Sequence, residues 1–298
     1  MRITVCLPDQ TLVLHDDLSR VRSRYQISTA TKGPGELRGS FCTPRGHHII
    51  RAKIGAQAPL NTVFVGRRPT GEIWSKDLGE AFPGRDWMLT RILWLSGKQP
   101  GKNRLGECDT MRRYIYLHGS PETAVMGVPG SIGCVRMRNQ DIIDLFDAVP
   151  VLTRVDIDDF RIVCGAWSVM QADARPLREQ VFVVEQGVPR EIEIDEFDAT
   201  SQHAVAYDDT GKPIGTGRLL PDGHIGRMAV TADRRGDGVG RALLMRLMDT
   251  ARTLGFRELR LNAQTHASGF YQQFGFAKVG EAFIEAGIDH FEMTKALS

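Results

Sequence analysis

The chain has 298 residues, 42% of them hydrophobic and 25% charged, with a formal net charge of +2. This length suits two domains rather than one, and the composition excludes a disordered or fibrous chain. No apolar stretch is long enough to span a bilayer. The first residues lack the apolar core of a signal peptide, so we expect a cytoplasmic protein with no membrane span.

The charge is shared unevenly along the chain. Residues 1–157 hold 22 Lys+Arg against 15 Asp+Glu, and residues 158–298 hold 16 against 21. This shift predicts a domain boundary between residues 157 and 158. A basic first half suits a substrate rich in carboxylates, although a solvated arginine-rich surface explains it equally well. The basic residues are scattered and form no recognised motif, so nucleic-acid binding is not expected.

The first half reads as mainly β. Gly/Pro turns separate short predicted strands at Ile3–Leu7, Leu12–His15, Arg24–Ser28, His48–Lys53, Thr62–Val65, Tyr114–His118 and Val151–Ile157. A helix is predicted from Asn139, a good N-cap residue. Many short strands with one helix favour a sandwich or a barrel-like fold.

The stretch 116–137 carries the chemistry of this half. A cysteine nucleophile needs a base, donors for the oxyanion and a seat for the substrate. His118 provides a base, the N–H groups of Gly133 and Cys134 provide donors, and Arg136 is suited to a substrate carboxylate. If His118 activates Cys134, the pKa of the thiol should lie below about 8.5. On residue types alone, a structural cysteine and histidine remain an alternative. The five cysteines show no paired or metal-ligand spacing, so no disulfide and no metal are expected.

Two sequence motifs in this half resemble the YkuD-type L,D-transpeptidases. They are His118-Gly119-Ser120 and Ser131-x-Gly133-Cys134-x-Arg136, and the turn Thr43-Pro44-x-Gly46 also resembles that family. The chain departs from the family at Ile132, where a second histidine is common. The resemblance implies a mainly-β domain over residues 1–157 that acts on a peptidoglycan stem peptide or muropeptide.

The same resemblance assigns roles to single residues. Cys134 is the expected nucleophile, His118 the base, and Ser120 a residue that orients His118. Ser131, Gly133 and Arg136 are expected to surround the substrate and its oxyanion. Trp74, Trp87 and Trp94 are expected in the core rather than at the substrate.

The second half alternates helices and strands, which predicts an α/β fold. Helices are expected at residues 176–184, from the end of the run 234–241 to the stop at Gly255, and at 267–274. Strands are expected at 203–207, 213–220, 224–230 and 258–261. Gly236, Gly238 and Gly240 stand between a strand and a helix, where backbone N–H groups can approach a pyrophosphate. A tight structural turn explains such glycines as well.

The glycine loop, read with Gly269-Phe270-Tyr271 downstream, is similar to the GNAT acetyltransferases. The run 181–186, read with His203-Ala204-Val205 and Gly287-Ile288-Asp289-His290, resembles their ElaA-like branch. The resemblance implies a GNAT domain over residues 158–298 that uses acetyl-CoA and a small amine acceptor. Tyr271 would protonate the departing CoA thiolate. The expected cofactor-binding residues are Met228, Ala229, Val230, Arg235, Gly236, Asp237, Gly238, Val239, Gly240 and Arg241.

Several residues on the acceptor side stay undecided between an acceptor role and a solvated surface. They are Glu185, Glu193, Asp195, Asp198, His203, Asn262 and His266. The sequence therefore predicts a bifunctional enzyme, an L,D-transpeptidase or L,D-carboxypeptidase joined to an acetyltransferase. Two alternatives remain: a first half that only binds muropeptides, or one that is an inert scaffold.

Overall fold

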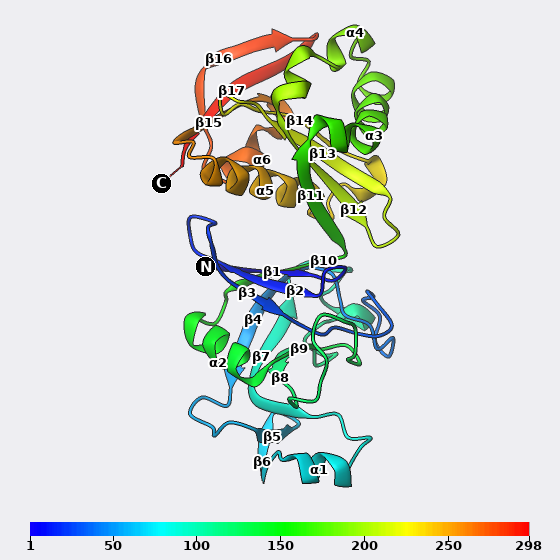
Figure 1. Cartoon of the computed structure of the whole chain (residues 1–298), viewed down its shortest axis with the longest axis vertical. Coiled ribbons are helices and arrows are strands. Elements are labelled where there is room, and N and C mark those ends of the chain that lie inside the picture. Colours follow the sequence, from blue (N-terminus) through cyan, green and yellow to red (C-terminus); the bar gives the residue numbers. More distant parts are fainter. Residues whose placement is uncertain (298) are drawn as a thin grey trace. The chain divides into compact units, whose positions relative to one another are not determined.

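The computed structural model describes residues 1–297. The chain divides into two compact units, Met1–Asp159 and Phe160–Ser298 (Figure 1). Each unit contains its own hydrophobic core. The first unit is mainly β and the second is α/β, as the sequence predicts. Within the described residues, no helix is both long enough and apolar enough to cross a membrane.

The first unit is built on one large sheet. In chain order its elements are β1 (Arg2–Cys6), β2 (Thr11–His15), β3 (Val21–Gln26), β4 (Gly46–Ile54), β5 (Thr62–Val65), β6 (Arg68–Ile73), α1 (Lys76–Ala81), β7 (Met88–Gly97), the 3₁₀ turn η1 (Gly106–Cys108), β8 (Tyr116–Gly119), β9 (Val135–Met137), α2 (Asn139–Ala148) and β10 (Arg154–Asp158). The strand order is β3-β2-β1-β10-β4-β7-β5-β6, and β8 pairs with both β7 and β9. Most pairs are antiparallel, but β1–β10 and β8–β9 are parallel.

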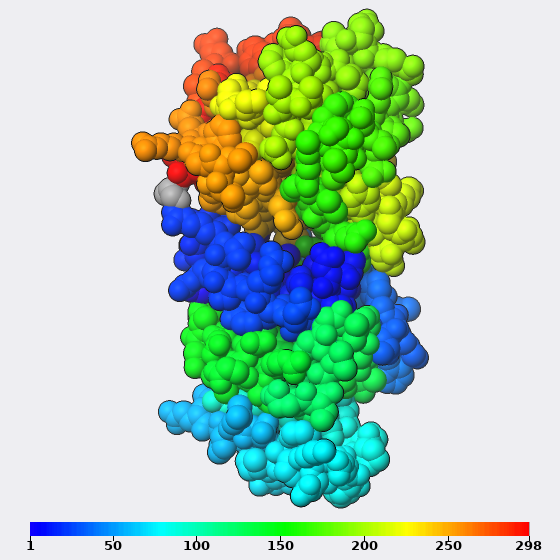
Figure 2. Space-filling model, viewed as in Figure 1, coloured from blue at the N-terminus to red at the C-terminus, as the bar shows by residue number. Residues whose placement is uncertain are grey.

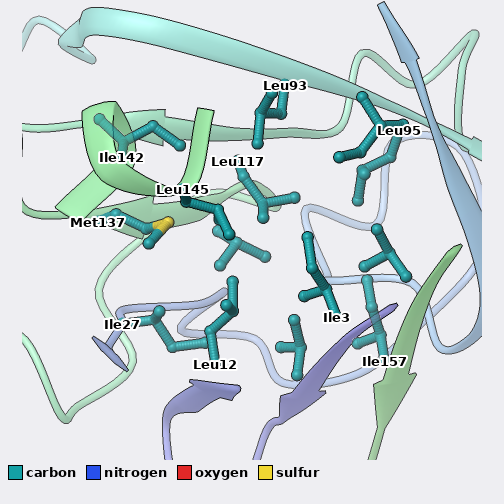
Figure 3. Packing of buried hydrophobic residues seen from close by; sticks show 14 of the residues in the cluster. Ile3, Leu12, Ile27, Leu93, Leu95, Leu117, Met137, Ile142, Leu145 and Ile157 are labelled. Atoms are coloured by element: carbon teal, nitrogen blue, oxygen red, sulfur yellow. The ribbon is translucent and has the colours of Figure 1, made fainter. Parts of the chain in front are cut away.

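The main core of this unit forms because one side of each strand is apolar. In β1, Ile3 and Val5 are buried and alternate with more accessible neighbours. Figure 3 shows Ile142 and Leu145 of α2 packed toward the side chains of the sheet. In β8 and β9, the residues that alternate with these core residues lie on the other face of the sheet.

A small lobe, here called the cap, consists of residues 62–87: β5, β6, α1 and the loop that leads to β7. Figure 2 shows this lobe at one end of the first unit, in cyan. It has its own apolar cluster, in which Trp74 and Trp87 pack with Val63 and Leu89. The two tryptophans are therefore core residues, as the sequence predicts.

The strand prediction was wrong at two places that shape the site. Strand β7 was not predicted, because its residues are buried on both faces and show no alternation. Strand β8 begins at Tyr116 rather than Tyr114, because Tyr114 has a φ of 58° and breaks the extended backbone. Helix α2 begins at Asn139 itself, whose buried amide bonds Thr90 and Asn61 instead of capping the helix.

The second unit contains two smaller sheets. Its elements are β11 (Phe160–Ala166), α3 (Trp167–Arg178), the π-helical turn η2 (Glu179–Glu185), α4 (Arg190–Glu193), η3 (Glu196–Thr200), β12 (Gln202–Asp208), β13 (Pro213–Leu219), β14 (Ile225–Val230), η4 (Ala232–Arg234), α5 (Val239–Thr253), β15 (Glu258–Gln264), η5 (Thr265–Ala267), α6 (Ser268–Gln272), β16 (Ala277–Glu285) and β17 (Ile288–Ala296). One sheet has the order β11-β12-β13-β14 and the other β15-β17-β16.

Helix α5 follows the predicted pattern. Leu243, Leu244, Leu247 and Met248 are buried on one face, and Gly255, with a φ of 85°, follows the end of the helix. The helix predicted at residues 176–184 in fact starts at Trp167 and continues into the π-helical turn η2. Strands β11, β16 and β17 were not predicted.

Candidate active sites

Strand register brings the first set of candidate residues onto one face. Strands β8 and β9 are parallel, with His118 opposite Arg136 and Leu117 opposite Val135. Leu117 and Val135 point into the main core. Because side chains alternate along a strand, His118 and Arg136 lie on the opposite face, and Cys134 joins them two residues before Arg136.

His118 is held as a neutral base. Its ring is completely buried, and Nδ1 lies 2.8 Å from the carbonyl oxygen of Gly119. That oxygen can only accept, so Nδ1 carries the proton and Nε2 keeps its lone pair. Nε2 is buried and has no hydrogen-bond partner. Burial lowers the pKa of His118, which keeps the imidazole neutral.

Ser120 does not have the predicted orienting contact. Its Oγ donates to the carbonyl oxygen of Met137 at 2.9 Å and so ties β8 to β9. The Gly119 carbonyl orients the His118 ring instead. The sequence did not indicate this, because any residue at position 119 would supply a carbonyl.

Cys134 lies in an apolar environment beside β7. Its side chain packs with a cluster that includes Tyr116, Trp94 and Met88, and Sγ lies 3.5 Å from the carbonyl oxygen of Tyr114. Burial raises the pKa of the Cys134 thiol to about 12, although the N–H of Tyr116 favours the thiolate. The predicted depressed pKa is therefore wrong for this structure, in which Cys134 rests as a thiol and His118 as a neutral base.

The turn before Cys134 is fixed by hydroxyl groups. Gly133 has a φ of 135°, which favours glycine, and its N–H donates to Ser131 Oγ at 3.2 Å. Ser131 Oγ donates to the carbonyl oxygen of Cys134 at 2.5 Å. Thr43 Oγ1 donates to the carbonyl oxygen of Gly133 at 3.0 Å. The Gly133 N–H, one of the two predicted oxyanion donors, is thus occupied by Ser131 in this state.

Arg136 already holds an anion. One guanidinium nitrogen lies 2.7 Å from the carbonyl oxygen of Gly130, and the other lies 2.6 Å from a carboxylate oxygen of Asp86. Asp86 belongs to the cap and was not among the predicted residues. No sequence signal indicates it, because the pair is separated by 50 residues along the chain.

A second cap residue also lies beside the Cys134 cluster. Arg67 stacks over the ring of Trp94, with 4.4 Å between the guanidinium carbon and the ring centroid, and donates to the hydroxyl of Tyr116 at 3.0 Å. Trp94 and Tyr116 both belong to the cluster that contains Cys134. Arg67 and Asp86 therefore join the cap to the face that carries the nucleophile. Trp94 is more accessible than the other two predicted core tryptophans.

The candidate coenzyme site in the second unit is made from an unpaired strand edge. Strand β14 pairs with β13 on one side, and a bulge places Arg227 and Met228 opposite Gly217. On its other side, within the described residues, only an isolated bridge from His224 to Arg260 joins it to β15. The edge of residues 228–230 is therefore largely open to a linear amide chain, except that the carbonyl oxygen of Val230 accepts a hydrogen bond from Arg235 Nε.

The glycine loop leads from this strand into the N-terminus of α5. Gly236 and Gly238 have φ values of 83° and 92°, and Gly238 caps the helix. The N–H groups of the first turn of α5 point toward the loop and carry the positive end of the helix dipole. These features fit a diphosphate. The structure therefore places Met228–Val230 on β14, and Arg235–Arg241 in the loop and the first turn of α5 that follow it.

The side chain of Arg235 is engaged within the protein. Its guanidinium pairs with Glu185 through contacts of 2.5 and 2.8 Å, and Nε donates to the carbonyl oxygen of Val230 at 3.1 Å. Glu185, one of the undecided acceptor residues, is thus an ion-pair partner. Arg235 would contribute to diphosphate binding through its backbone rather than through its guanidinium.

Tyr271 lies in an aromatic cluster on α6. Its ring packs edge-on against Phe270 and Phe276, with centroid distances of 4.9 and 6.2 Å. Burial raises the pKa of Tyr271 to about 12. The phenol therefore stays protonated at neutral pH, which the predicted acid role requires.

Most undecided acceptor residues are engaged in a buried charge network. Arg178 is fully buried and bonds both Glu193 and Asp198 at 2.6 Å. Arg218 bonds Asp195 and Asp198, and His203 Nε2 lies 3.0 Å from the carbonyl oxygen of Asp198. A buried, paired carboxylate is a poor amine base, so these residues hold α4 and η3 against the sheet. Among residues 1–297 no group of His, Cys, Asp and Glu side chains is suited to a metal ion.

Comparison with known proteins identifies a family for each unit. The YkuD family, described as the L,D-transpeptidase catalytic domain, matches residues 1–157, and a GNAT acetyltransferase domain matches residues 170–297. The Bacillus subtilis protein named "Uncharacterized N-acetyltransferase YjcF" is 42% identical over 127 residues, which make up 41% of this chain and 90% of that protein. Protein ElaA of Escherichia coli strain K12 is 32% identical over 40% of this chain and 82% of that protein. The crystal structure of Escherichia coli ElaA covers 45% of this chain and 99% of its own, with 30% identity and a TM-score of 0.42.

Proposed function

Because the chain belongs to the YkuD family of L,D-transpeptidase catalytic domains and carries a GNAT acetyltransferase domain, we propose that it is a bifunctional acyltransferase. In the first unit, Cys134 attacks the carbonyl of an L,D-linked stem-peptide bond and forms a thioester, and D-alanine leaves. Water or an amine then takes the acyl group, giving L,D-carboxypeptidase or transpeptidase activity. In the second unit, acetyl-CoA acetylates a small amine.

One observation supports the first activity most. The Nε2 atom of His118 is buried, unprotonated and without a partner, on the strand face that also carries Cys134. A buried nitrogen without a hydrogen-bond partner lowers the stability of the fold, and such an exception in a folded protein favours a functional role for its lone pair. In this proposal it takes the proton of the Cys134 thiol as the sulfur attacks, and later returns a proton to the leaving amine.

The free edge of β14 and the N-terminus of α5 support the second activity. A GNAT domain implies acetyl-CoA as the cosubstrate, and the backbone of residues 228–241 offers the donors that its diphosphate and pantetheine arm need. Tyr271, whose phenol is protonated at neutral pH, would give its proton to the CoA thiolate. The acceptor amine stays open, because the buried charge network takes up most candidate bases.

A non-catalytic muropeptide-binding role for the first unit is the second candidate. The observation in its favour is the partly buried Cys134, whose raised pKa keeps it a thiol, beside an Arg136 that already holds a carboxylate. Such a site could dock a peptide without breaking it. The two functions differ in whether Cys134 forms a covalent adduct.

A carbapenem separates the two, since this type of β-lactam resembles the acyl donor. We expect the intact mass of the protein to rise by one carbapenem, with peptide mapping that places the adduct on Cys134. The protein should also release D-alanine from a tetrapeptide stem. Cys134→Ala should lose both signals, and Cys42→Ala, the matched control, should keep both. No adduct at Cys134 together with no D-alanine from any stem peptide would favour the binding function.

A further inference from the structure

Arg136 is paired with a carboxylate of the protein itself. Its contact with Asp86 is 2.6 Å long, a length typical of a charge-assisted hydrogen bond. The pair is partly shielded, with 19% of the Arg136 side chain and 36% of the Asp86 side chain exposed. Arg136 is also the residue proposed to seat the carboxylate of the substrate, so Asp86 lies where that group would bind.

The cap holds Asp86 in this position from both sides. Arg85 pairs with Glu72 through contacts of 3.0 and 2.6 Å, and its guanidinium lies 4.3 Å from the ring centroid of Trp87. Trp87 is itself buried in the apolar cluster of the cap. With both neighbours anchored in the cap, the Asp86 side chain is left to reach Arg136. The position of Asp86 is therefore fixed by its two anchored neighbours in the loop.

The charge of Asp86 reaches the reacting groups as well. It opposes the lowering of the His118 pKa by burial, and it adds to the raising of the Cys134 pKa by burial. Both effects favour the protonated form of the group. Asp86 is thus close enough to act on both residues, and while it stays in place it disfavours the thiolate.

We infer that Asp86 is an internal occupant of the carboxylate seat at Arg136 and sets the specificity of the Cys134 site. An acyl donor binds Arg136 only if it carries a carboxylate that replaces Asp86 as the ion-pair partner of the guanidinium. A donor without a carboxylate leaves the pair intact and gains no orientation from Arg136. This inference rests on the proposed function, because it assigns the selection of the acyl donor to the same site.

Two alkylating reagents test the exchange directly. Iodoacetate and iodoacetamide react with a thiol in the same way, each losing iodide, but only iodoacetate carries a carboxylate. The measurement is the rate of alkylation of Cys134 by each reagent, followed by peptide mapping of the full-length protein. Changes in the nucleophilicity or the accessibility of Cys134 affect both rates equally, so the ratio of the two rates does not depend on them.

Removal of Asp86 should raise the ratio of the iodoacetate rate to the iodoacetamide rate. In Asp86→Ala we expect a rise of roughly tenfold or more, the usual worth of a hydrogen bond to a charged group. In the double variant Asp86→Ala/Arg136→Gln the ratio should return to near the wild-type value. Removal of the Asp86 charge has no effect on carboxylate binding once the Arg136 guanidinium is also gone. Asp86→Asn serves as a second variant that keeps the size of the side chain.

The matched control is Glu80→Gln, which removes a charge from the same cap where Glu80 faces Lys76. Its ratio should equal that of the wild type. An unchanged ratio in both Asp86→Ala and Asp86→Asn would overturn the inference and leave Asp86 as a structural clip. A rise that persists in the double variant would overturn it too, since general repulsion then explains the effect. If no variant is alkylated at Cys134 by either reagent, the proposed nucleophile itself fails, and the inference fails with it.

Discussion

The two candidate sites differ in the part of the chain that meets the ligand. Around Cys134 the work falls to side chains: His118 as base, Arg136 as anion seat and Thr43 as the support of the turn. At the glycine loop it falls to the backbone, through the edge of β14 and the first turn of α5. Each site contains an arginine paired internally, yet only for Arg136 does that pair block a proposed ligand contact.

This contrast teaches where a substitution should hurt. A site made of side chains should be sensitive to truncation, since each role is carried by one atom. A site made of backbone should tolerate truncation and be sensitive to any change that alters φ or adds a Cβ. The contrast fails if the Cys134 site tolerates side-chain truncation, or if the glycine loop tolerates an added Cβ.

The largest effect is expected at His118. In His118→Ala the acylation of Cys134 by a carbapenem should slow by a factor on the order of 10²–10⁴, the usual worth of a general base. Rates from intact-mass time courses measure it, and acetyl-CoA turnover should stay unchanged as the internal control. If His118→Ala keeps the wild-type acylation rate, the unpartnered Nε2 has no part in the reaction.

The next effect concerns the coenzyme loop. Gly238 has a φ of 92°, and a Cβ there would lie 3.1 Å from the guanidinium of Arg241, so Gly238→Val should lower acetyl-CoA affinity about tenfold or more. Calorimetric titration with acetyl-CoA measures this change.

The matched variant at the same loop is Arg235→Ala. Its affinity should stay within about fivefold of the wild type, the upper worth of an exposed ion pair. A larger loss in Arg235→Ala than in Gly238→Val would show that a side chain, and not the backbone, carries the diphosphate.

The last effect is of another kind, a dependence of stability on pH in the first unit. Burial lowers the pKa of His48 to about 4 and also lowers that of His118, whereas both lie near 6.5 in the unfolded chain. Between these values the unfolded state binds more protons, so the free energy of unfolding falls as the pH drops below 6.5. The slope is at most about 1.4 kcal/mol per pH unit for each histidine.

Urea unfolding followed by tryptophan fluorescence at pH 7.5 and pH 5 measures this slope, since three of the four tryptophans, Trp74, Trp87 and Trp94, lie in the first unit, and Trp167 lies in the second. In His48→Gln the free energy of unfolding should fall less steeply as the pH drops below 6.5. The same slope in His48→Gln and in the wild type would mean that His48 titrates normally in the folded state.

The sequence predicted the parts of the molecule that local patterns determine. Alternation placed His118 on a strand, and the spacing of apolar residues gave α5 and its stop at Gly255. His118 lies on β8, Arg136 lies on the adjacent β9, and Cys134 directly precedes β9. Strand β7, although central, escaped prediction because burial on both faces removes the alternation that marks a strand.

Contacts between distant segments could not be predicted. Asp86 reaches Arg136 across 50 residues, and the carbonyl of Gly119 takes a role that was assigned to a side chain. The thiol pKa also depends on burial by Trp94 and Met88, which no motif records. These features follow from tertiary packing, which a single sequence does not reveal.

The parallel pairing of β8 and β9 has a consequence for how this unit can diverge. Register fixes His118 opposite Arg136, while the chain between the strands runs outside the ladder. Insertions or deletions between residues 121 and 126 leave the pairing untouched, whereas residues 127–131 are tied to residues 27–31 by backbone hydrogen bonds. A one-residue slip within β8 would turn His118 into the core, and one within β9 would do the same to Arg136. The number of residues between base and nucleophile is therefore free to drift among descendants of this chain, whereas their phase along the two strands is not.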